Sequence, residues 1–323
     1  MLDSCGRTIN YLRISITDRC NLRCRFCMPE SGVENIPHSE ILRYEEILEI
    51  TKAAADLGIN RFRISGGEPL LRRGIEGFLK ELASQKGTSR VSLTTNGLLL
   101  ASKAKELAEA GLNAVNVSLD SLQEERLKRL CGGGTPTQII EGIDAAIEAC
   151  LKVKINTVLL RPVLAELPQF IDFSEERKIP IRFIEFMPLD KETAERTGEE
   201  VIPVPELIKA LNELGELVFE PGPEGCGPSR YYRLKKRKAT IGIISALSSP
   251  FCDTCNRIRL TADGRLKPCL ASAVEIDVKK ALREGANKEE IKSLLRQTIE
   301  AKPKAHQLAE GEVPQRNMSK IGG

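Results

Sequence analysis

The sequence is poor in histidine and has no long hydrophobic run. Its two histidines, His38 and His306, are too few for a metal or hydrolase site built from imidazoles. No stretch of about eighteen apolar residues is present, and the first residues include Asp3, Arg7 and Arg13. We therefore expect neither a membrane-spanning helix nor a secretory leader, and we predict a cytoplasmic protein.

Nor does the chain carry a strong excess of charge of one sign. With 48 basic and 45 acidic residues the net charge is +3, which argues against a nucleic-acid surface but leaves room for a local anion pocket. A length of 323 residues, 41% of them hydrophobic, is enough for one large α/β domain or two smaller ones.

Cysteine, by contrast, is abundant, with ten residues. Because a reducing compartment disfavours disulfides, clustered thiols there indicate metal binding or catalysis. Most of these cysteines fall into two tight groups. The others, which we expect to be buried or incidental small residues, are Cys5, Cys131, Cys150 and Cys226.

Up to about Leu189 the chain alternates between short runs rich in Val, Ile, Leu or Thr and amphipathic helical runs. The predicted strands are 11–17, 61–64, 90–95, 114–119, 153–160 and 181–186, and the predicted helices are 44–57, 75–84, 102–110, 138–151 and 167–177. This alternation predicts a parallel sheet, either doubly wound or curled into a barrel with fewer units than the eight that close one. Functional residues in such folds lie at the C-terminal ends of the strands.

Beyond Leu189 the pattern changes. A polar stretch at 191–200 precedes a predicted helix at 205–214, a Gly- and Pro-rich segment at 221–228 and two strand-like runs at 230–234 and 240–244. We expect the basic tetrad 235–238 between those runs to be a hairpin turn with solvated charges. The last third of the chain is thus predicted to be a smaller α+β extension.

The first cysteine group directly follows the first predicted strand. It consists of Cys20, Cys24 and Cys27, spaced C-x3-C-x2-C. Structural zinc normally takes four ligands, whereas a [4Fe-4S] cluster held by three cysteines leaves one iron open to a substrate or cofactor. Because no histidine or further cysteine is nearby in the sequence, we favour the cluster over a zinc knuckle that borrows a fourth ligand.

A second motif, Ser65-Gly66-Gly67-Glu68-Pro69, follows the second predicted strand, and its glycines permit close backbone approach to a ligand. Alone it is a weak signal. Together with C-x3-C-x2-C, and with Phe26 before the third cysteine, it resembles the radical S-adenosylmethionine (SAM) enzymes. The resemblance implies that the cysteines hold a [4Fe-4S] cluster whose open iron chelates SAM, and that reduction cleaves SAM to a 5′-deoxyadenosyl radical.

A second cysteine group comprises Cys252, Cys255 and Cys269, spaced C-x2-C-x13-C. A zinc ribbon would usually supply a second C-x2-C pair, so another cluster with an open iron is the more economical interpretation. Arg257 and Arg259 lie beside it and would face the same side of an extended segment. Paired guanidiniums there indicate phosphate ligands, with ordinary surface arginines as the alternative.

Five motifs in order narrow the resemblance to the GTP 3′,8-cyclase family of molybdenum-cofactor biosynthesis. They are the two cysteine triplets, C-N-R-I-R-L at 255–260, R-F-I-E-F-M-P at 182–188 and M-S-K-I-G-G at 318–323. The resemblance spans the chain from about Cys5 to Gly323. It implies a lyase that converts GTP to (8S)-3′,8-cyclo-7,8-dihydroguanosine 5′-triphosphate after the adenosyl radical abstracts the ribose C3′ hydrogen.

The resemblance also implies the roles of particular residues. Contacts to GTP would come from Arg13, Arg63, Thr94, Lys154, Arg182, Arg257 and Arg259. The SAM site would be lined by Phe26, Gly67, Ser118 and Met187. The two triplets would ligate two [4Fe-4S] clusters, and Arg257, Arg259, Gly322 and Gly323 would take part in catalysis, with the Gly-Gly tail entering the active site.

With this resemblance we expect an incomplete (β/α)6 TIM-type barrel over residues 1–200, carrying the first cluster. A C-terminal α+β extension over residues 201–323 would carry the second cluster and the tail. The implied partners are GTP, an electron donor and a downstream cyclic pyranopterin monophosphate synthase, with no nucleic acid or membrane; the sequence does not distinguish a monomer from a homodimer.

Two alternatives stay open at this point. One is another radical SAM enzyme with an auxiliary cluster, such as a peptide or sulfatase maturase. The other is a non-catalytic, ferredoxin-like iron–sulfur electron carrier or a zinc-binding module, which would need neither SAM nor a barrel.

Overall fold

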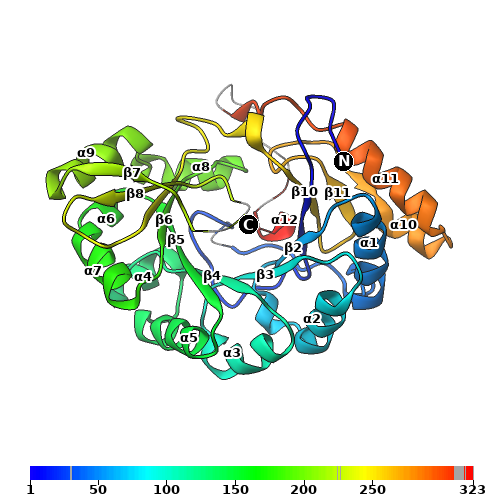
Figure 1. Cartoon of the computed structure of the whole chain (residues 1–323), viewed down its shortest axis with the longest axis horizontal. Helices are drawn as coiled ribbons and strands as arrows, with labels where there is room; N and C mark the ends of the chain where they lie inside the picture. The colour runs from blue at the N-terminus through cyan, green and yellow to red at the C-terminus, as the bar shows by residue number, and fades with distance from the viewer. Residues whose placement is uncertain (30, 224, 226, 309–315, 317, 323) are drawn as a thin grey trace.

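The computed structural model describes residues 1–29, 31–223, 225, 227–308, 316 and 318–322. These residues form one curved sheet with helices packed on its convex side (Figure 1). The strand order in the described part of the chain is β12-β11-β10-β1-β2-β3-β4-β5-β6-β9-β8-β7. From β10 through β9 every neighbouring pair is parallel. The predicted incomplete barrel is therefore confirmed.

The first six strands follow the predicted ranges closely. They are β1 (Tyr11–Ser15), β2 (Arg61–Ser65), β3 (Arg90–Thr95), β4 (Ala114–Ser118), β5 (Lys152–Leu159) and β6 (Ile181–Glu185). The helices that connect them are α1 (Tyr44–Asp56), α2 (Ile75–Ser84), α3 (Leu100–Glu109), α4 (Glu124–Cys131), α5 (Pro136–Glu148), α6 (Arg161–Leu164) and α7 (Leu167–Arg177). Of these, α4 and the short α6 were missed by the sequence analysis.

Local sequence explains where these helices begin and end. Helix α5 starts at a capping box, because Thr135 accepts a hydrogen bond from the Gln138 amide and the Gln138 side chain accepts one from the Thr135 amide. Pro136 fits the first helical position, where no backbone donor is needed. Past α1, Gly58 adopts a φ of +84°, a left-handed conformation that glycine tolerates and that turns the chain into β2.

The C-terminal part extends this sheet at both of its edges. Strands β9 (Ile241–Ile244), β8 (Arg230–Leu234) and β7 (Leu217–Glu220) continue it beyond β6, while β10 (Arg257–Leu260), β11 (Arg265–Lys267) and β12 (Ile276–Asp277) continue it beyond β1. A partial barrel leaves two edges with unpaired backbone groups, and pairing them with later strands removes that liability. The predicted extension is thus confirmed, and it forms no separate sheet.

The remaining elements lie mostly where the sequence was hardest to interpret. They are α8 (Lys191–Thr197), α9 (Val204–Leu214), α10 (Val278–Arg283), α11 (Lys288–Glu300) and α12 (Met318–Ile321), with the short 3-10 turns η1 (His38–Glu40), η2 (Pro69–Leu71), η3 (Gly198–Glu200) and η4 (Cys252–Thr254). The polar stretch 191–200, for which no element was predicted, folds as α8 and η3, and Asp190 caps the helix by accepting from the Thr193 amide at 2.8 Å.

The basic tetrad forms the predicted hairpin turn between β8 and β9, but at least two of its charges are paired, and one of these pairs joins Lys235 to Glu216 at 2.7 Å. Arg237 contacts the carboxylates of Asp172 and Glu175 on α7. Among the described residues, no helix is both long enough and apolar enough to cross a lipid bilayer.

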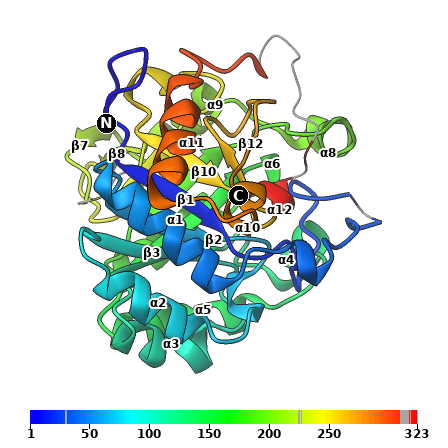
Figure 2. The ribbon, with the colours of Figure 1, turned by 90° about the vertical axis from the view of Figure 1, so that its right-hand side faces the viewer.

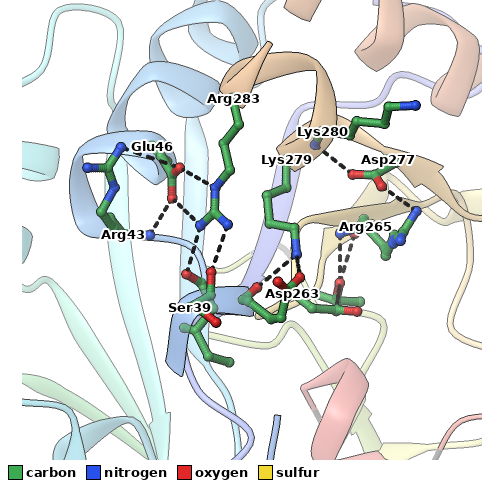
Figure 3. Close-up of polar contacts among 12 residues, drawn as sticks. Ser39, Arg43, Glu46, Asp263, Arg265, Asp277, Lys279, Lys280 and Arg283 are labelled. Atoms are coloured by element: carbon green, nitrogen blue, oxygen red, sulfur yellow. Dashed lines mark hydrogen bonds and ion pairs between the residues drawn. The ribbon is translucent and has the colours of Figure 1, made fainter. Parts of the chain in front are cut away.

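A network of ion pairs joins α10 to the start of α1 and to the preceding η1 turn, and we call it the α1–α10 joint (Figure 3). Glu46, which is buried on α1, accepts a hydrogen bond at 2.9 Å from the Nε of Arg283 on α10. Its carboxylate also caps its own helix by accepting from the Arg43 amide. Lys279 reaches Glu40 across the same boundary. The joint therefore fixes the C-terminal extension against the first helix of the barrel, with α11 and α1 side by side (Figure 2).

Candidate active site

A cavity of about 340 Å³ opens at the C-terminal ends of the parallel strands, inside the curve of the sheet. Both cysteine triplets line it, although they are separated by more than two hundred residues in the sequence. The other predicted site residues on its wall are Arg13, Phe26, Gly67, Thr94, Ser118, Met187, Arg257 and Arg259. The fold thus gathers most of the predicted site around one space.

The loop that carries the first triplet is held by the Gly-Gly motif after β2. The Gly67 amide donates to the Thr17 carbonyl at 2.7 Å, and the Glu68 amide donates to the Arg19 carbonyl at 2.7 Å. A side chain at Gly67 would place its Cβ 2.2 Å from the Arg19 carbonyl oxygen, which no residue other than glycine avoids. Glycine is required here by the neighbouring backbone, in addition to any role toward a ligand.

Glu68 of the same motif acts inside the protein. It is buried, and its carboxylate accepts hydrogen bonds from the Leu70 and Asn96 amides and from the Thr95 hydroxyl. Burial raises its pKa to about 7, although those donors oppose the shift. Glu68 therefore ties the end of β3 to the loop after β2, and with it one wall of the cavity.

The thiols of Cys20, Cys24 and Cys27 are close enough to interact electrostatically. Burial raises the pKa of Cys20 to about 11 and raises that of Cys27 as well. Protonated thiols of this kind suit a site completed by iron, because a metal binds the thiolate and displaces the proton.

The described residues include no ready-made site for a single metal ion. In the described part of the chain, no three Cys, His, Asp or Glu side chains are grouped so that they could hold a single metal ion. A cubane cluster is wider than an ion and is reached by thiols that lie farther apart. The three cysteines of one loop, Cys20, Cys24 and Cys27, line the cavity, and such a set of thiols is one that a [4Fe-4S] cluster takes.

One further cysteine lies at this site. Cys131, at the end of α4, is buried, hydrogen-bonds with Cys24 and raises the pKa of the Cys24 thiol, with burial adding to the shift. Its own thiol lies 3.9 Å from the Asp120 carboxylate. The expectation that Cys131 is buried is confirmed, whereas Cys5 and Cys150 are exposed and Cys226 lies outside the described residues.

The second triplet is assembled from η4 and the turn after β11. Cys252, Cys255 and Cys269 interact with one another, and burial raises the pKa of Cys252. For Cys255 burial acts in the same direction, but Arg257 and Lys302 outweigh it and the pKa is lowered. This triplet therefore lies in a more positive environment than the first.

Residues 302–306 complete that environment and were missed by the sequence analysis. Lys302 is 4% exposed and lines the cavity. The His306 backbone amide donates to the Cys252 sulfur, and its ring Nε2 lies 2.9 Å from the Ala246 carbonyl oxygen. The signal in the sequence was the rare histidine, which the count of two led us to set aside.

Arginines on neighbouring strands form two rows across the inner face of the sheet. Arg259, Arg13 and Arg63 are direct partners on β10, β1 and β2. Next to them, the row from β10 to β3 runs through Arg257, Tyr11, Arg61 and Arg90. Like charges directly opposite each other destabilise a sheet, so this arrangement favours a bound anion.

Arg63, Lys154 and Arg182 do not line the main cavity. They gather in a smaller space of about 230 Å³ toward the N-terminal ends of the same strands, together with Arg61 and Arg90. Arg182 is 5% exposed, and its Nε and Nη2 atoms have no hydrogen-bond partner. Burial lowers its pKa to about 10, so the guanidinium stays charged at neutral pH, and within the described residues no carboxylate pairs with it.

Other predicted ligand residues carry unpartnered polar atoms too. The Thr94 hydroxyl and the Arg257 Nε are buried without a hydrogen bond in the structure. Buried polar groups are normally paired, and each exception calls for a missing partner. Their concentration on the inner face of the sheet indicates a polar ligand with several acceptor atoms.

The C-terminal segment lies inside the curve of the sheet, where α12 appears red near the centre of Figure 1. The Arg259 guanidinium donates to the Gly322 carbonyl at 2.7 Å. Gly322 has a φ of +82°, and a Cβ there would lie 2.7 Å from the Ser65 hydroxyl oxygen. The expectation that the tail reaches the active site therefore agrees with the structure at Gly322, while Gly323 lies outside the described residues.

Comparison with known proteins decides the family. Residues 14–174 match the family model of the radical SAM superfamily, and residues 179–308 match that of Molybdenum Cofactor Synthesis C. The chain is 47% identical to a GTP 3′,8-cyclase from Pelotomaculum thermopropionicum and 46% identical to one from Thermodesulfovibrio yellowstonii. Both alignments cover 100% of this chain and 100% of the relative. The chain belongs to the GTP 3′,8-cyclase family.

Membership of the GTP 3′,8-cyclase family confirms the resemblance inferred from the five motifs and favours it over an electron carrier or a zinc module. Solved structures support the fold alone. SuiB from Streptococcus suis bound to S-adenosylmethionine has a TM-score of 0.64 at 18% identity, over 88% of this chain and 68% of that one. AnSMEcpe with bound AdoMet has a TM-score of 0.53 at 16% identity, over 87% of this chain and 81% of that one.

Proposed function

We propose that this protein is a lyase that cyclises GTP between ribose C3′ and guanine C8, in molybdenum-cofactor biosynthesis. The observation that carries the proposal is that the groups needed for both SAM cleavage and nucleotide binding lie on one side of the sheet. Two triplets of thiols and a group of basic side chains, most of them arginines, face the same concave side of one sheet. A radical SAM site explains the first triplet, and a nucleotide triphosphate explains the cations.

The triphosphate would lie toward the N-terminal ends of the strands. There Arg63, Lys154 and Arg182 surround the smaller space, and guanidinium groups bind phosphate oxygens with paired, charge-assisted hydrogen bonds. Arg13 links this space to the main cavity, since its side chain lies between Arg63 and Arg259 in the row. The ribose would then lie near Thr94 and Arg13, at the boundary between the two cavities.

The first cluster would be held by Cys20, Cys24 and Cys27, with SAM against Phe26, Gly67, Ser118 and Met187. When bound, this pair supplies a 5′-deoxyadenosyl radical that takes the hydrogen from C3′ and leaves as 5′-deoxyadenosine. The contribution of the chain is to hold C3′ at the mouth of the SAM site and to keep water out of a cavity lined by apolar residues such as Leu127, Ile139 and Val158.

A second [4Fe-4S] cluster at Cys252, Cys255 and Cys269 is part of the proposal. It would face the guanine end of the substrate, because this triplet lines the same cavity as the first and lies next to Arg257 and Arg259 in sequence. Both arginines, with Gly322 and Gly323, would then position the base and the ribose for closure of the C3′–C8 bond.

We also propose that residues 1–200 form the radical SAM partial barrel that carries the first cluster, and that residues 201–323 form an extension that carries the second cluster and the Gly-Gly tail, with residues of both parts binding GTP. An electron donor and a downstream cyclic pyranopterin monophosphate synthase would be the protein's functional partners. The cytoplasmic location expected from the sequence stays a prediction.

The proposal is tested with anaerobically reconstituted protein, dithionite, SAM and GTP. We expect 5′-deoxyadenosine and a cyclised GTP product to appear together by mass spectrometry. Cys252→Ala should abolish the cyclised product while still permitting slow SAM cleavage. Cys5→Ser, at an exposed cysteine, should retain both products and is the control. SAM cleavage that neither requires nor consumes GTP in the unsubstituted protein would refute the substrate assignment.

A further inference from the structure

Lys302 is a buried lysine whose ammonium group points at the second triplet. Its Nζ donates to the carbonyls of Arg257 and Pro268, each at 2.8 Å, and it also hydrogen-bonds with the Cys255 thiol. The side chain is almost fully buried and lines the main cavity. A buried ammonium group normally requires an anionic partner, and its partners here are two neutral carbonyls and one potential thiolate.

The segment that carries Lys302 is held against the triplet from the other side. Arg7 is buried and donates to the carbonyls of Cys252, Lys302, Pro303 and Lys304. Asp3 balances this guanidinium at 2.6 Å. The backbone from 302 to 304 is thereby fixed, so the position of the Lys302 ammonium group does not depend on solvent-exposed contacts.

Lys304, on the same segment, differs from Lys302 in the exposure of its side chain. Lys304 is exposed and has its side chain in solvent, whereas its backbone carbonyl takes part in the same anchor. Two lysines two residues apart therefore carry the same charge, one beside the triplet and one outside it. This pair offers a matched comparison between a buried charge and an exposed one.

We propose that Lys302 supplies a fixed positive charge to the second cluster through Cys255, and that this charge raises the reduction potential of the cluster. The inference rests on the proposed second cluster. Reduction adds one negative charge, which a cation in a buried site stabilises strongly. Lys302 thus acts as a positioning residue on the cluster and touches neither of the reacting atoms C3′ and C8.

The test compares Lys302→Met, which keeps length but removes charge, with Lys302→Arg and with Lys304→Met. All are made in the full chain with Cys20→Ala, Cys24→Ala and Cys27→Ala, so that only the second cluster assembles. Iron content per chain is measured after anaerobic reconstitution, and the midpoint potential is measured by a redox titration followed by electron paramagnetic resonance.

We expect Lys302→Met to shift the midpoint potential to a more negative value, whereas Lys302→Arg and Lys304→Met stay near the parent protein. If Lys302→Met instead loses the cluster iron and Lys302→Arg keeps it, the requirement for charge is supported as well. An unchanged potential with full iron content overturns the proposal, and so does equal loss of iron in both Lys302 variants.

Failure of the proposed function would look different. The triple-alanine parent would then assemble no cluster at all, before any substitution at Lys302 is made. A parent that does assemble a cluster keeps the second-cluster assignment in place, whatever the effect of Lys302.

Discussion

Two regions of this protein concentrate charged side chains, and they differ in the partners of their cations. In the α1–α10 joint, each cation meets a carboxylate, as Arg283 meets Glu46 and Lys279 meets Glu40 (Figure 3). On the inner face of the sheet, and within the described residues, Arg13, Arg63 and Arg259 donate to neutral oxygens, those of Ser65, Tyr11 and Gly322.

The difference separates structural charges from functional ones. Paired charges in the joint hold two parts of the chain together and need nothing from outside. The arginines of the inner face repel one another across neighbouring strands. Burial lowers the pKa of Arg259 to about 10, which is still far above neutral pH, so its guanidinium stays charged. Such a site is completed by an anion. The net charge of +3 for the whole chain indicates neither the paired charges of the joint nor the clustered arginines of the inner face.

Arg182→Met should have the largest effect, because it removes a buried guanidinium that has unpaired donors. We expect the dissociation constant for GTP to rise roughly 30- to 1,000-fold, or about 2–4 kcal/mol, as measured by calorimetry on reconstituted protein without SAM or reductant. The melting temperature of the ligand-free protein should not fall. Arg283→Met is the converse control, and we expect it to have normal GTP affinity and a lower melting temperature. Unchanged GTP affinity in Arg182→Met would show that this residue does not bind the phosphates.

Glu46→Gln tests the joint and should have an intermediate effect. The substitution leaves Arg283 without its carboxylate and weakens the cap of α1, so the free energy of unfolding should fall by about 1–3 kcal/mol in urea titrations. Glu49→Gln, at an exposed position of the same helix, should stay within about 0.5 kcal/mol of the parent. GTP affinity should equal that of the parent in both variants, because the joint stabilises the fold and does not bind GTP. A loss of GTP affinity in Glu46→Gln would contradict this separation.

Glu175→Gln should have the smallest effect and one that depends on pH. Hydrogen bonding to Arg237 lowers the pKa of Glu175 to about 2, well below the value of 4.5 for a free glutamate. A depressed pKa stabilises the folded state above pH 4.5, and this contribution is lost as the pH falls toward 2. The free energies of unfolding of parent and variant, obtained from urea titrations, should therefore differ by less than about 1 kcal/mol at pH 6, and this difference should shrink steadily as the pH falls from 4.5 toward 2. A constant gap over this range would mean that the ion pair does not contribute.

Much of the fold was predictable because its signals are local. The strands at 90–95 and 230–234 and the helices at 75–84 and 167–177 have the predicted bounds, since apolar periodicity and flanking glycines determine them. The arrangement of β9 and β10 was not predictable. Which strand pairs with β1 depends on contacts between residues such as Arg13 and Arg259, nearly 250 positions apart, and single-sequence periodicity carries no information on such pairs.

The site shows the same division. The cysteine triplets and Arg257 with Arg259 were found from spacing, because metal ligands and paired guanidiniums recur at short intervals. Lys302 and Arg7 were missed, since an isolated basic residue in sequence gives no sign that it will be buried. The alternating arginines at 61 and 63 offered a usable signal, because residues two apart in a strand share a face and here that face looks inward.

The pairing of β1 with β10 also constrains the order of events during synthesis. The partner strand of β1 at Arg257–Leu260 leaves the ribosome about 240 residues later, which takes about 12–50 s at roughly 5–20 residues per second. Throughout that interval the outer edge of β1 has no partner, and the loop bearing Cys20, Cys24 and Cys27 is attached to it. A nascent chain in this state exposes the unpaired backbone groups of the β1 edge and the three thiols of Cys20, Cys24 and Cys27. Iron should therefore be inserted only after β10 has been synthesised and has paired with β1.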